Sequence, residues 1–451
     1  MAPRIHAKMQ LCDWSGLDRD FSAAISALRN DALVGDPFSL LCVPASPADY
    51  LHCARLFASR PGGRQQLWNG ERYSHERIRV AYLSADLRNH AVGWLVAGAL
   101  EAHDRSRFEV TGLSIGPLTN DALQLRLRNA VELFLDVEAR TDREIAKLIR
   151  DLEIDILVDL NGFTQNSRTF VMAQRPAPIQ VNYLGYSGTM GVDYIDYIIA
   201  DETVLPREHT AFFAEKAVWL PDSYMASDDK RPLAERTPTR PECGLPDNAF
   251  VFCCFNQTYK ITPEVFRIWM NVLKAIEGSV LWLSAGNPIA EANLRREAER
   301  HGVSARRLVF APTLPEMVDH LARQRQADLF LDTLPYNAHT TANDALWVGL
   351  PVLTHLGEAF HGRVAASLLQ TAGLPELITI SGEAYESLAI ELARDRGKLA
   401  ALRQKLANGR ATTPLFNSKL FTRRLEAAYL AMYQRYQAGL APDHITVSKQ
   451  D

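Results

Sequence analysis

Residues 327–354 read ADLFLDTLPYNAHTTANDALWVGLPVLT, and this stretch decides the fold. The apolar run at residues 327–331 predicts a buried parallel strand, which a short helix and a second strand follow. His339, Thr340 and Thr341 therefore stand where a strand gives way to the N-terminus of a helix. Free backbone N–H groups and the positive end of the helix dipole meet there, which predicts an anion site. The stretch thus indicates an open α/β sheet with a phosphate-bearing ligand at its strand ends.

A second interpretation of the same residues stays open. Thr341-x-x-Asp344 has the spacing of a capping box, in which two side chains satisfy backbone N–H groups at the start of a helix. Many helices carry such a box with no ligand nearby. The rest of the chain has to decide between capping and phosphate binding.

Size and composition exclude several classes of protein. A chain of 451 residues exceeds one ordinary core, so we expect two domains. The formal net charge is -4 and no long basic run occurs, which argues against a nucleic-acid partner. The six cysteines show no C-x-x-C spacing, which fits a reducing compartment and no zinc site. With no signal pattern and no stretch of about 18 apolar residues, we expect a cytoplasmic protein without membrane contact.

Strands alternate with helices twice along the chain, which predicts two parallel sheets covered by helices. We expect two doubly wound, Rossmann-like domains facing across a cleft, where nucleotide-type ligands bind. The expected parts are a helical N-terminal segment (1–74), a first Rossmann-like domain (75–226), a Pro-rich linker (227–247), a second Rossmann-like domain (248–415), and a final helix with its tail (416–451). The first domain lacks G-x-G-x-x-G after its opening strand, and no Walker A sequence appears, which weakens the dehydrogenase and kinase interpretations.

Gln257 and Lys260 follow the first strand of the second domain and precede a helix. A lysine in a strand-end loop can neutralise a diphosphate, although a solvated lysine at a helix entrance would have the same sequence. The pairing with His339-Thr340-Thr341 in one domain favours the diphosphate. His320 and Arg323 lie one turn apart on a helix, either at the surface or beside a nucleotide base.

Asp86 and His90 close the first strand of the first domain. His90 could act as a general base with Asp86 orienting it, or it could simply bond loop backbone. Leu184 and Gly185 open a glycine-rich loop after another strand. Glycines there permit close approach of a ligand, but ordinary turns use them too.

Five motifs in order resemble one family. They are Asn161-Gly162-Phe163-Thr164, Arg175-Pro176-Ala177-Pro178-Ile179-Gln180, Leu184-Gly185-Tyr186-Ser187-Gly188-Thr189, Phe255-Asn256-Gln257-x-Tyr259-Lys260 and His339-Thr340-Thr341-x-x-Asp344-x-Leu346-Trp347. Together they resemble the catalytic region of the protein O-linked N-acetylglucosaminyltransferases and their bacterial and SPINDLY-like relatives. The resemblance runs from about residue 8 to residue 437.

The resemblance implies a GT-B fold, a UDP-sugar donor, inversion at the anomeric carbon and no metal or other cofactor. It implies a final helix that packs back on the first domain. By position, Lys260 and Gln257 would hold the donor diphosphate, and Thr340 and Thr341 would add hydrogen bonds. His339 and Asp344 would border the phosphate, ribose and sugar, and His320 and Arg323 would lie by the uracil. Leu184 and Gly185 would flank the sugar. His90 would be the candidate base, with Asp86 as its proton-relay partner. A donor phosphate oxygen is the rival base.

Some positions depart from the family. Ala338 stands where many members have Gly, and Tyr336 stands for a Cys near the sugar's N-acetyl group. Ala91-Val92 replaces Pro-Thr of the animal enzymes after His90, and Ser187 replaces their Pro. SPINDLY-like fucosyltransferases lack the histidine at position 339, so His339 favours a uridine donor. The family's tetratricopeptide repeats are missing, which leaves the choice of acceptor proteins open.

We therefore expect transfer of N-acetylglucosamine from UDP to Ser or Thr hydroxyls of proteins. Three alternatives stay open. The donor could be UDP-glucose or GDP-fucose, the acceptor could be Asn or a small glycan, or the chain could bind nucleotide sugars without catalysis.

Overall fold

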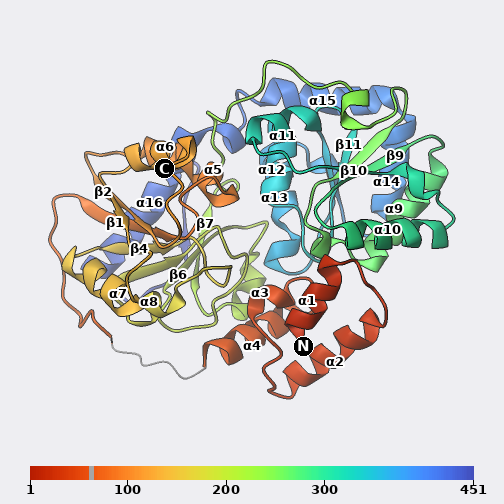
Figure 1. The fold of residues 1–451 in the computed structure, drawn as a ribbon. Coiled ribbons are helices and arrows are strands. Elements are labelled where there is room, and N and C mark those ends of the chain that lie inside the picture. The colour runs from red at the N-terminus through yellow and green to blue at the C-terminus, as the bar shows by residue number, and fades with distance from the viewer. Residues whose placement is uncertain (60–65, 451) are drawn as a thin grey trace. The chain divides into compact units, whose positions relative to one another are not determined.

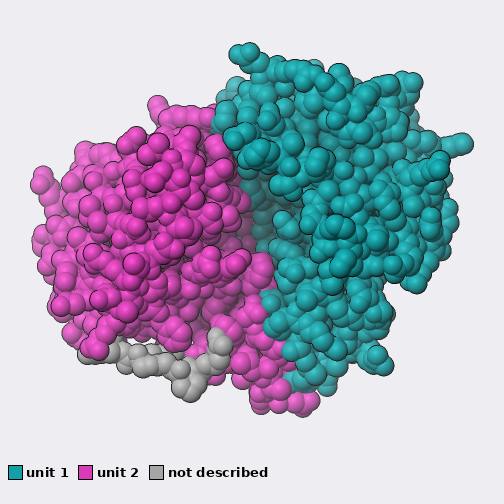
Figure 2. Space-filling view, viewed as in Figure 1, with its two compact units in different colours: residues 1–27, 39–46, 231–413 teal, residues 28–38, 47–230, 414–451 magenta. Residues whose placement is uncertain are grey.

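The computed structural model describes residues 1–59 and 66–450, which form two compact units (Figure 2). Unit 1 contains residues 1–27, 39–46 and 231–413, and unit 2 contains residues 28–38, 47–230 and 414–451. The N-terminal segment expected at 1–74 is thus divided between the units, with residues 60–65 outside the described part. The boundary at residues 230 and 231 falls inside the expected linker.

Unit 2 holds an eight-stranded sheet in the order β14-β7-β6-β5-β4-β1-β2-β3. Every recorded strand pair is parallel, and the central strands are buried apolar runs, as a sheet covered on both faces requires. The strands are β1 (Ile78–Ser84), β2 (Phe108–Ser114), β3 (Leu133–Asp136), β4 (Ile156–Asp159), β5 (Ile179–Asn182), β6 (Tyr197–Asp201), β7 (Lys216–Leu220) and β14 (Ile445–Thr446).

In unit 2, the local sequence explains where the helix α7 begins. In α7, Thr141 and Glu144 form a complete capping box, and Ile145 and Ile149 face the core. The α-helices are α4 (Pro47–Ala58), α5 (Ala91–Ala102), α6 (Ala122–Asn129), α7 (Asp142–Asp151), α8 (Thr169–Ala173) and α16 (Ser418–Gln437). The final helix α16, blue in Figure 1, packs against α5, which confirms its expected return to the first domain. The phenol of Tyr429 in α16 lies 3.1 Å from that of Tyr82 in β1.

Unit 1 holds a six-stranded parallel sheet in the order β10-β9-β8-β11-β12-β13. Its strands are β8 (Val251–Cys254), β9 (Val280–Ser284), β10 (Leu308–Ala311), β11 (Leu329–Leu331), β12 (Val352–His355) and β13 (Ile378–Thr379). Its α-helices include α1 (Ala2–Gln10), α9 (Pro263–Ala275), α10 (Pro288–Arg300), α11 (Met317–Gln324), α12 (Thr340–Trp347), α13 (Val364–Thr371), α14 (Gly382–Arg394) and α15 (Arg396–Gly409). Most of α2 (Leu17–Arg29) also belongs to unit 1, and α3 (Pro37–Leu40) lies at a unit boundary.

The N-terminal helix α1 packs on the 3-10 turn at Thr258–Lys260 in unit 1. The Thr258 hydroxyl donates to the carbonyl of Gln10 at 2.7 Å, and the rings of His6 and Tyr259 lie 4.5 Å apart. The first helix of the chain thus supports the turn that carries Lys260.

Both sheets reverse their strand order at one point, between β1 and β4 in unit 2 and between β8 and β11 in unit 1. This confirms the expected pair of doubly wound α/β units. Ligands of such sheets bind at the strand ends beside the reversal, because the following loops part there. Among the described helices, none is both long and apolar enough to cross a membrane.

Candidate nucleotide-sugar site

The helix α12 starts at Thr340, so His339-Thr340-Thr341 stands at its N-terminus as the sequence predicts. Thr340 and Thr341 are its first two residues, and their N–H groups have no acceptor inside the helix. The capping-box interpretation is wrong. His339 occupies the N-cap position without a capping side-chain bond, and Asp344 is paired elsewhere. The amides at this helix start therefore face no competing side chain from a capping box.

An asparagine joins the two loops at the strand reversal of unit 1. The side-chain nitrogen of Asn256, after β8, donates to the Thr333 hydroxyl at 2.8 Å. Its side-chain oxygen accepts from the Thr341 hydroxyl. Asn256 is buried, so these bonds fix the start of α12 against the Lys260 loop.

Lys260 is buried, which contradicts the solvated-lysine interpretation. Its ammonium donates to the carbonyl of Asn337 at 2.8 Å and lies 3.7 Å from the ring centre of Tyr336. Burial lowers the pKa of Lys260 to about 7, with Asp332 opposing the shift. The structure thus places this amine against the loop that leads into α12.

Asp332 is a residue that sequence reasoning missed. Its carboxylate accepts from the N–H groups of Thr333 and Ala338 at 2.7 and 2.5 Å, and from the Thr354 hydroxyl at 2.7 Å. Burial raises its pKa in spite of these bonds. Asp332 therefore holds the loop between β11 and α12 in place through hydrogen bonds to its backbone. In the sequence, only the position of Asp332 at a strand end could have indicated this role.

Two histidines lie beside Tyr336. The His339 ring nitrogen Nε2 lies 3.0 Å from the His361 carbonyl, and the ring centres of His339 and His361 lie 4.9 and 5.5 Å from that of Tyr336. Burial lowers the pKa of His361 to about 3 and that of His339 well below its ordinary value. Both imidazoles are therefore neutral near pH 7. No local pattern indicated His361, because it belongs to a segment that follows β12 and lies apart from this loop in the chain.

Asp344 forms a buried ion pair with Arg231, at 2.6 Å between Nη1 and Oδ1. The same guanidinium donates to the Asn343 side chain at 2.5 Å and lies 5.0 Å from the Trp347 ring centre. Burial raises the pKa of Asp344 to about 6, and Arg231 opposes that shift. Arg231 thus holds α12 from the side, a contact that the expected linker did not suggest.

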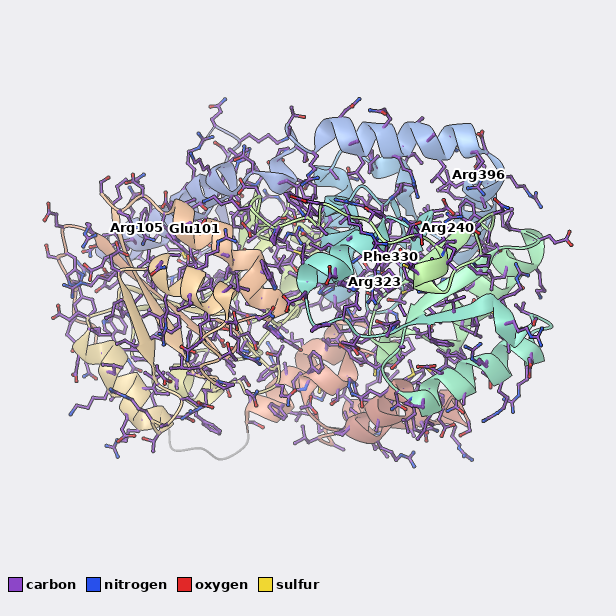
Figure 3. The ribbon with its side chains drawn as sticks, turned by 45° about the horizontal axis from the view of Figure 1, so that its top comes forward. Glu101, Arg105, Arg240, Arg323, Phe330 and Arg396 are labelled. Carbon is purple, nitrogen blue, oxygen red and sulfur yellow. The ribbon has the colours of Figure 1, made fainter. Side chains whose placement is uncertain are left out.

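His320 and Arg323 share one face of α11, as their spacing predicts; Figure 3 labels Arg323. Arg323 Nη2 lies 2.7 Å from His320 Nδ1, and Arg323 also donates to the Pro312 carbonyl. The ring of Phe255 lies 5.6 Å from that of His320. Burial lowers the pKa of His320 to about 4, so its ring is neutral near pH 7, and it meets the Phe255 ring edge to face at 75°. Gln257, in contrast, is exposed at the start of the 3-10 turn.

In unit 2, His90 is the N-cap of α5 and accepts a bond from the Val92 N–H at 3.3 Å through Nδ1. The same Nδ1 lies 3.5 Å from a carboxylate oxygen of Asp86. One ring nitrogen can satisfy only one of these contacts at a time, because the first needs a lone pair and the second a proton. Burial lowers the pKa of His90, although its side chain is 41% exposed, so the ring is neutral near pH 7.

Asn161 joins the loops of unit 2 as Asn256 does in unit 1. Its side chain accepts from the Ala85 N–H at 2.7 Å and donates to Asp86 at 3.1 Å. Asp86 is therefore held by Asn161 and lies near His90. Nothing in the sequence beyond the strand-end position of Asn161 indicated this bond.

The loop after β5 has a backbone conformation that few residue types can adopt. Leu184 has a left-handed backbone with φ 71°, and a Cβ atom on Gly185 would lie 1.9 Å from the Leu160 carbonyl oxygen. Such backbone strain is a feature of ligand-binding loops. Within the described residues, no group of three or more His, Cys, Asp or Glu side chains is placed to hold a metal ion.

The chain is similar to known proteins in both sequence and structure. The model of glycosyl transferase family 41 matches residues 65–237 and 230–425. The chain belongs to glycosyl transferase family 41. It is 33% identical over 470 residues to the probable UDP-N-acetylglucosamine–peptide N-acetylglucosaminyltransferase SEC of Arabidopsis thaliana, across 99% of this chain and 48% of that protein. A Caenorhabditis elegans enzyme named UDP-N-acetylglucosamine–peptide N-acetylglucosaminyltransferase is 27% identical across 97% of this chain and 49% of its own length.

The chain thus spans about half the length of these family 41 relatives. Among solved structures, a mutant O-GlcNAc transferase of Thermobaculum terrenum superposes with a TM-score of 0.84 at 32% identity, covering 97% of this chain and 85% of that one. Anabaena HepE, solved with UDP and glucose, matches with a TM-score of 0.52 at 12% identity, over 79% of this chain and 100% of that one, and shows the shared GT-B fold alone.

Proposed function

We propose that this family 41 protein transfers N-acetylglucosamine from UDP-N-acetylglucosamine to Ser or Thr hydroxyls of proteins, with inversion and without a metal cofactor. The names of its relatives support the donor and the peptide acceptor. The observation that carries the proposal is the Lys260 ammonium bonded to the Asn337 carbonyl, in the loop that runs into the N-terminus of α12. A cation from the turn after β8 is thus bonded to the loop whose end supplies the free amides of a helix start.

The acceptor hydroxyl oxygen forms a bond to the anomeric carbon while the bond from that carbon to the β-phosphate oxygen breaks. The hydroxyl proton passes to His90 in this proposal, and UDP leaves with the bonding electron pair. Negative charge grows on the diphosphate, so Lys260 and the amides of Thr340 and Thr341 bind it more strongly in the transition state. These groups supply the positive field that a metal ion provides in other transferases.

Four further assignments complete the proposal. Gln257 adds a bond to the diphosphate, and His339 and Asp344 border the nucleotide sugar. His320 and Arg323 contact the uracil, with the neutral His320 ring suited to a base. Leu184 and Gly185 flank the sugar in the strained loop. None of the six cysteines forms a disulfide, which supports a cytoplasmic location.

Lys260→Met tests this function, because methionine keeps the length and volume of the side chain but removes the charge. Transfer of labelled sugar to an acceptor peptide, followed by mass spectrometry, should fall by roughly 100- to 1,000-fold. Lys274→Met is the matched control, since Lys274 is exposed in α9. A Lys260→Met protein that turns over at the rate of the control would refute the proposal.

A calorimetric titration compares the donors. UDP-N-acetylglucosamine, UDP-glucose and GDP-fucose are titrated separately into the full chain. Tighter binding of GDP-fucose than of either uridine donor would overturn the donor assignment. Donor binding without any hydrolysis or transfer would instead indicate a nucleotide-sugar-binding protein.

A further inference from the structure

We propose that Tyr336 is a positioning residue for Lys260, whose aromatic face keeps the ammonium charged and available to an anionic ligand. This inference rests on the proposed function, because it concerns how the same lysine meets a diphosphate. Its basis is one contact, the 3.7 Å distance between the Lys260 nitrogen and the ring centre of Tyr336. At that distance the negative face of the ring attracts a cation.

The surroundings of Lys260 explain why a ring matters there. The titratable and charged groups around it are Asp332, Cys254, His339, His361, Tyr336, and Tyr259 with His6 stacked on it. Burial holds the two inner histidines neutral and raises the pKa of the Cys254 thiol and the Tyr259 phenol. Lys260 is therefore the cation of this cluster.

A carboxylate is the usual partner of a buried lysine, but the structure supplies a different one. Among residues 1–59 and 66–450, no carboxylate is recorded in ion-pair contact with Lys260, and Asp332 acts on it only over a longer range. Asp332 uses its oxygens on Thr333, Ala338 and Thr354. A ring and a carbonyl oxygen therefore stabilise the ammonium in direct contact, and neither neutralises it.

The consequence concerns pH. Burial has already brought the pKa of Lys260 to about 7, so a small loss of stabilisation discharges the amine near neutrality. Removal of the ring should lower this pKa further. A lysine must be protonated to bind a diphosphate, so binding is lost as pH rises through its pKa, and the loss should begin at lower pH without the ring.

The experiment measures the affinity of UDP by calorimetry between pH 6 and pH 8.5 for the wild type, Tyr336→Phe and Tyr336→Leu. The Phe variant is the matched control, because it keeps the ring and loses only the hydroxyl. At pH 8 we expect UDP to bind the Leu variant about tenfold more weakly than the Phe variant, and at pH 6 nearly equally. A purely structural effect of leucine would weaken binding by the same factor at both pH values and would overturn the inference.

A second series keeps the shape of the side chain. Phenylalanine analogues with increasing numbers of fluorine atoms at position 336 keep the ring but withdraw electron density from its face, which weakens its attraction for a cation. UDP affinity at pH 8 should fall stepwise along this series, and a constant affinity would overturn the inference even if the Leu variant failed to fold. If the wild-type protein does not bind UDP, the proposed function fails. If it binds UDP but the affinity stays constant across the fluorinated variants, only the role of Tyr336 is refuted.

Discussion

His90 caps a helix in the structure and is also the general base of the proposed function. Its Nδ1 accepts the Val92 N–H and so caps α5, while the same atom lies 3.5 Å from Asp86. When Nδ1 accepts the Val92 N–H, the neutral ring carries its hydrogen on Nε2 and cannot take up a proton there. A base needs the other tautomer, which has its hydrogen on Nδ1, the atom near Asp86. The general-base role and the capping role therefore make different demands on the side chain, and substitution can separate them.

We predict that His90→Ala lowers the turnover number for transfer by about 100-fold or more and leaves UDP affinity near its wild-type value. His90→Asn is the matched control, because its side-chain oxygen can still accept the Val92 N–H but cannot take up a proton near neutral pH. Steady-state transfer and UDP calorimetry check both. If His90→Asn turns over at the wild-type rate while His90→Ala does not, His90 acts as a cap and not as a base. If UDP affinity falls in both variants, His90 is a ligand of the donor.

At the scale of the element, α12 shows what the sequence could and could not reveal. The strand, the turn and the start of the helix at Thr340 follow from the apolar run and the polar residues after it. The pairing of Asp344 did not follow, because Thr341-x-x-Asp344 satisfies a local rule while its true partner, Arg231, is 113 residues away. The bonds of Asn256 and Asn161 were missed for the same reason.

The Arg231–Asp344 pair makes a prediction about α12. Removal of one partner from a buried pair leaves an uncompensated charge, so Arg231→Ala should cost about 3–5 kcal/mol in free energy of unfolding. The double variant Arg231→Met with Asp344→Leu replaces both charges by apolar groups and should recover most of this loss. Urea unfolding of both proteins measures the difference.

The same variants report on the anion site. A disordered α12 would misplace the amides of Thr340 and Thr341, so UDP should bind Arg231→Ala weakly and bind the double variant more tightly. An Arg231→Ala protein as stable as the wild type would contradict the role of this pair. Weak UDP binding by a stable double variant would instead indicate that Asp344 itself contacts the donor.

At the scale of the whole molecule, the chain order and the units do not coincide. The sequence predicted two doubly wound sheets and their strand-end loops, and both are present. It did not indicate the strands β3, β7, β13 and β14, and it treated the first 74 residues as one part, although α1 belongs to unit 1 and α4 to unit 2. Helical periodicity shows which face of a helix is buried but not which core buries it.

Both units are therefore assembled from separate segments, and truncation should affect them unequally. A chain that ends at Thr413 lacks α16, which buries Phe421, Leu425, Tyr429 and Met432 in unit 2. Burial of each such side chain contributes about 1.5–3 kcal/mol, so their loss is comparable with the 5–15 kcal/mol stability of a whole domain. His103 would also lose Glu426, which lies 2.9 Å from its ring nitrogen.

We predict that this truncated chain loses the unfolding transition of unit 2 while unit 1, whose segments all remain, still binds UDP. A chain that ends at Leu440 is the matched control, because it keeps α16 and loses only the two-residue edge strand β14 and the tail. Thermal circular dichroism and UDP calorimetry on the two proteins give the comparison. Loss of UDP binding together with unit 2 would show that unit 1 cannot hold its fold alone. Equal melting of the two truncated chains would contradict the structural role of α16, since the contacts of Tyr429 and Glu426 would then contribute nothing to unit 2.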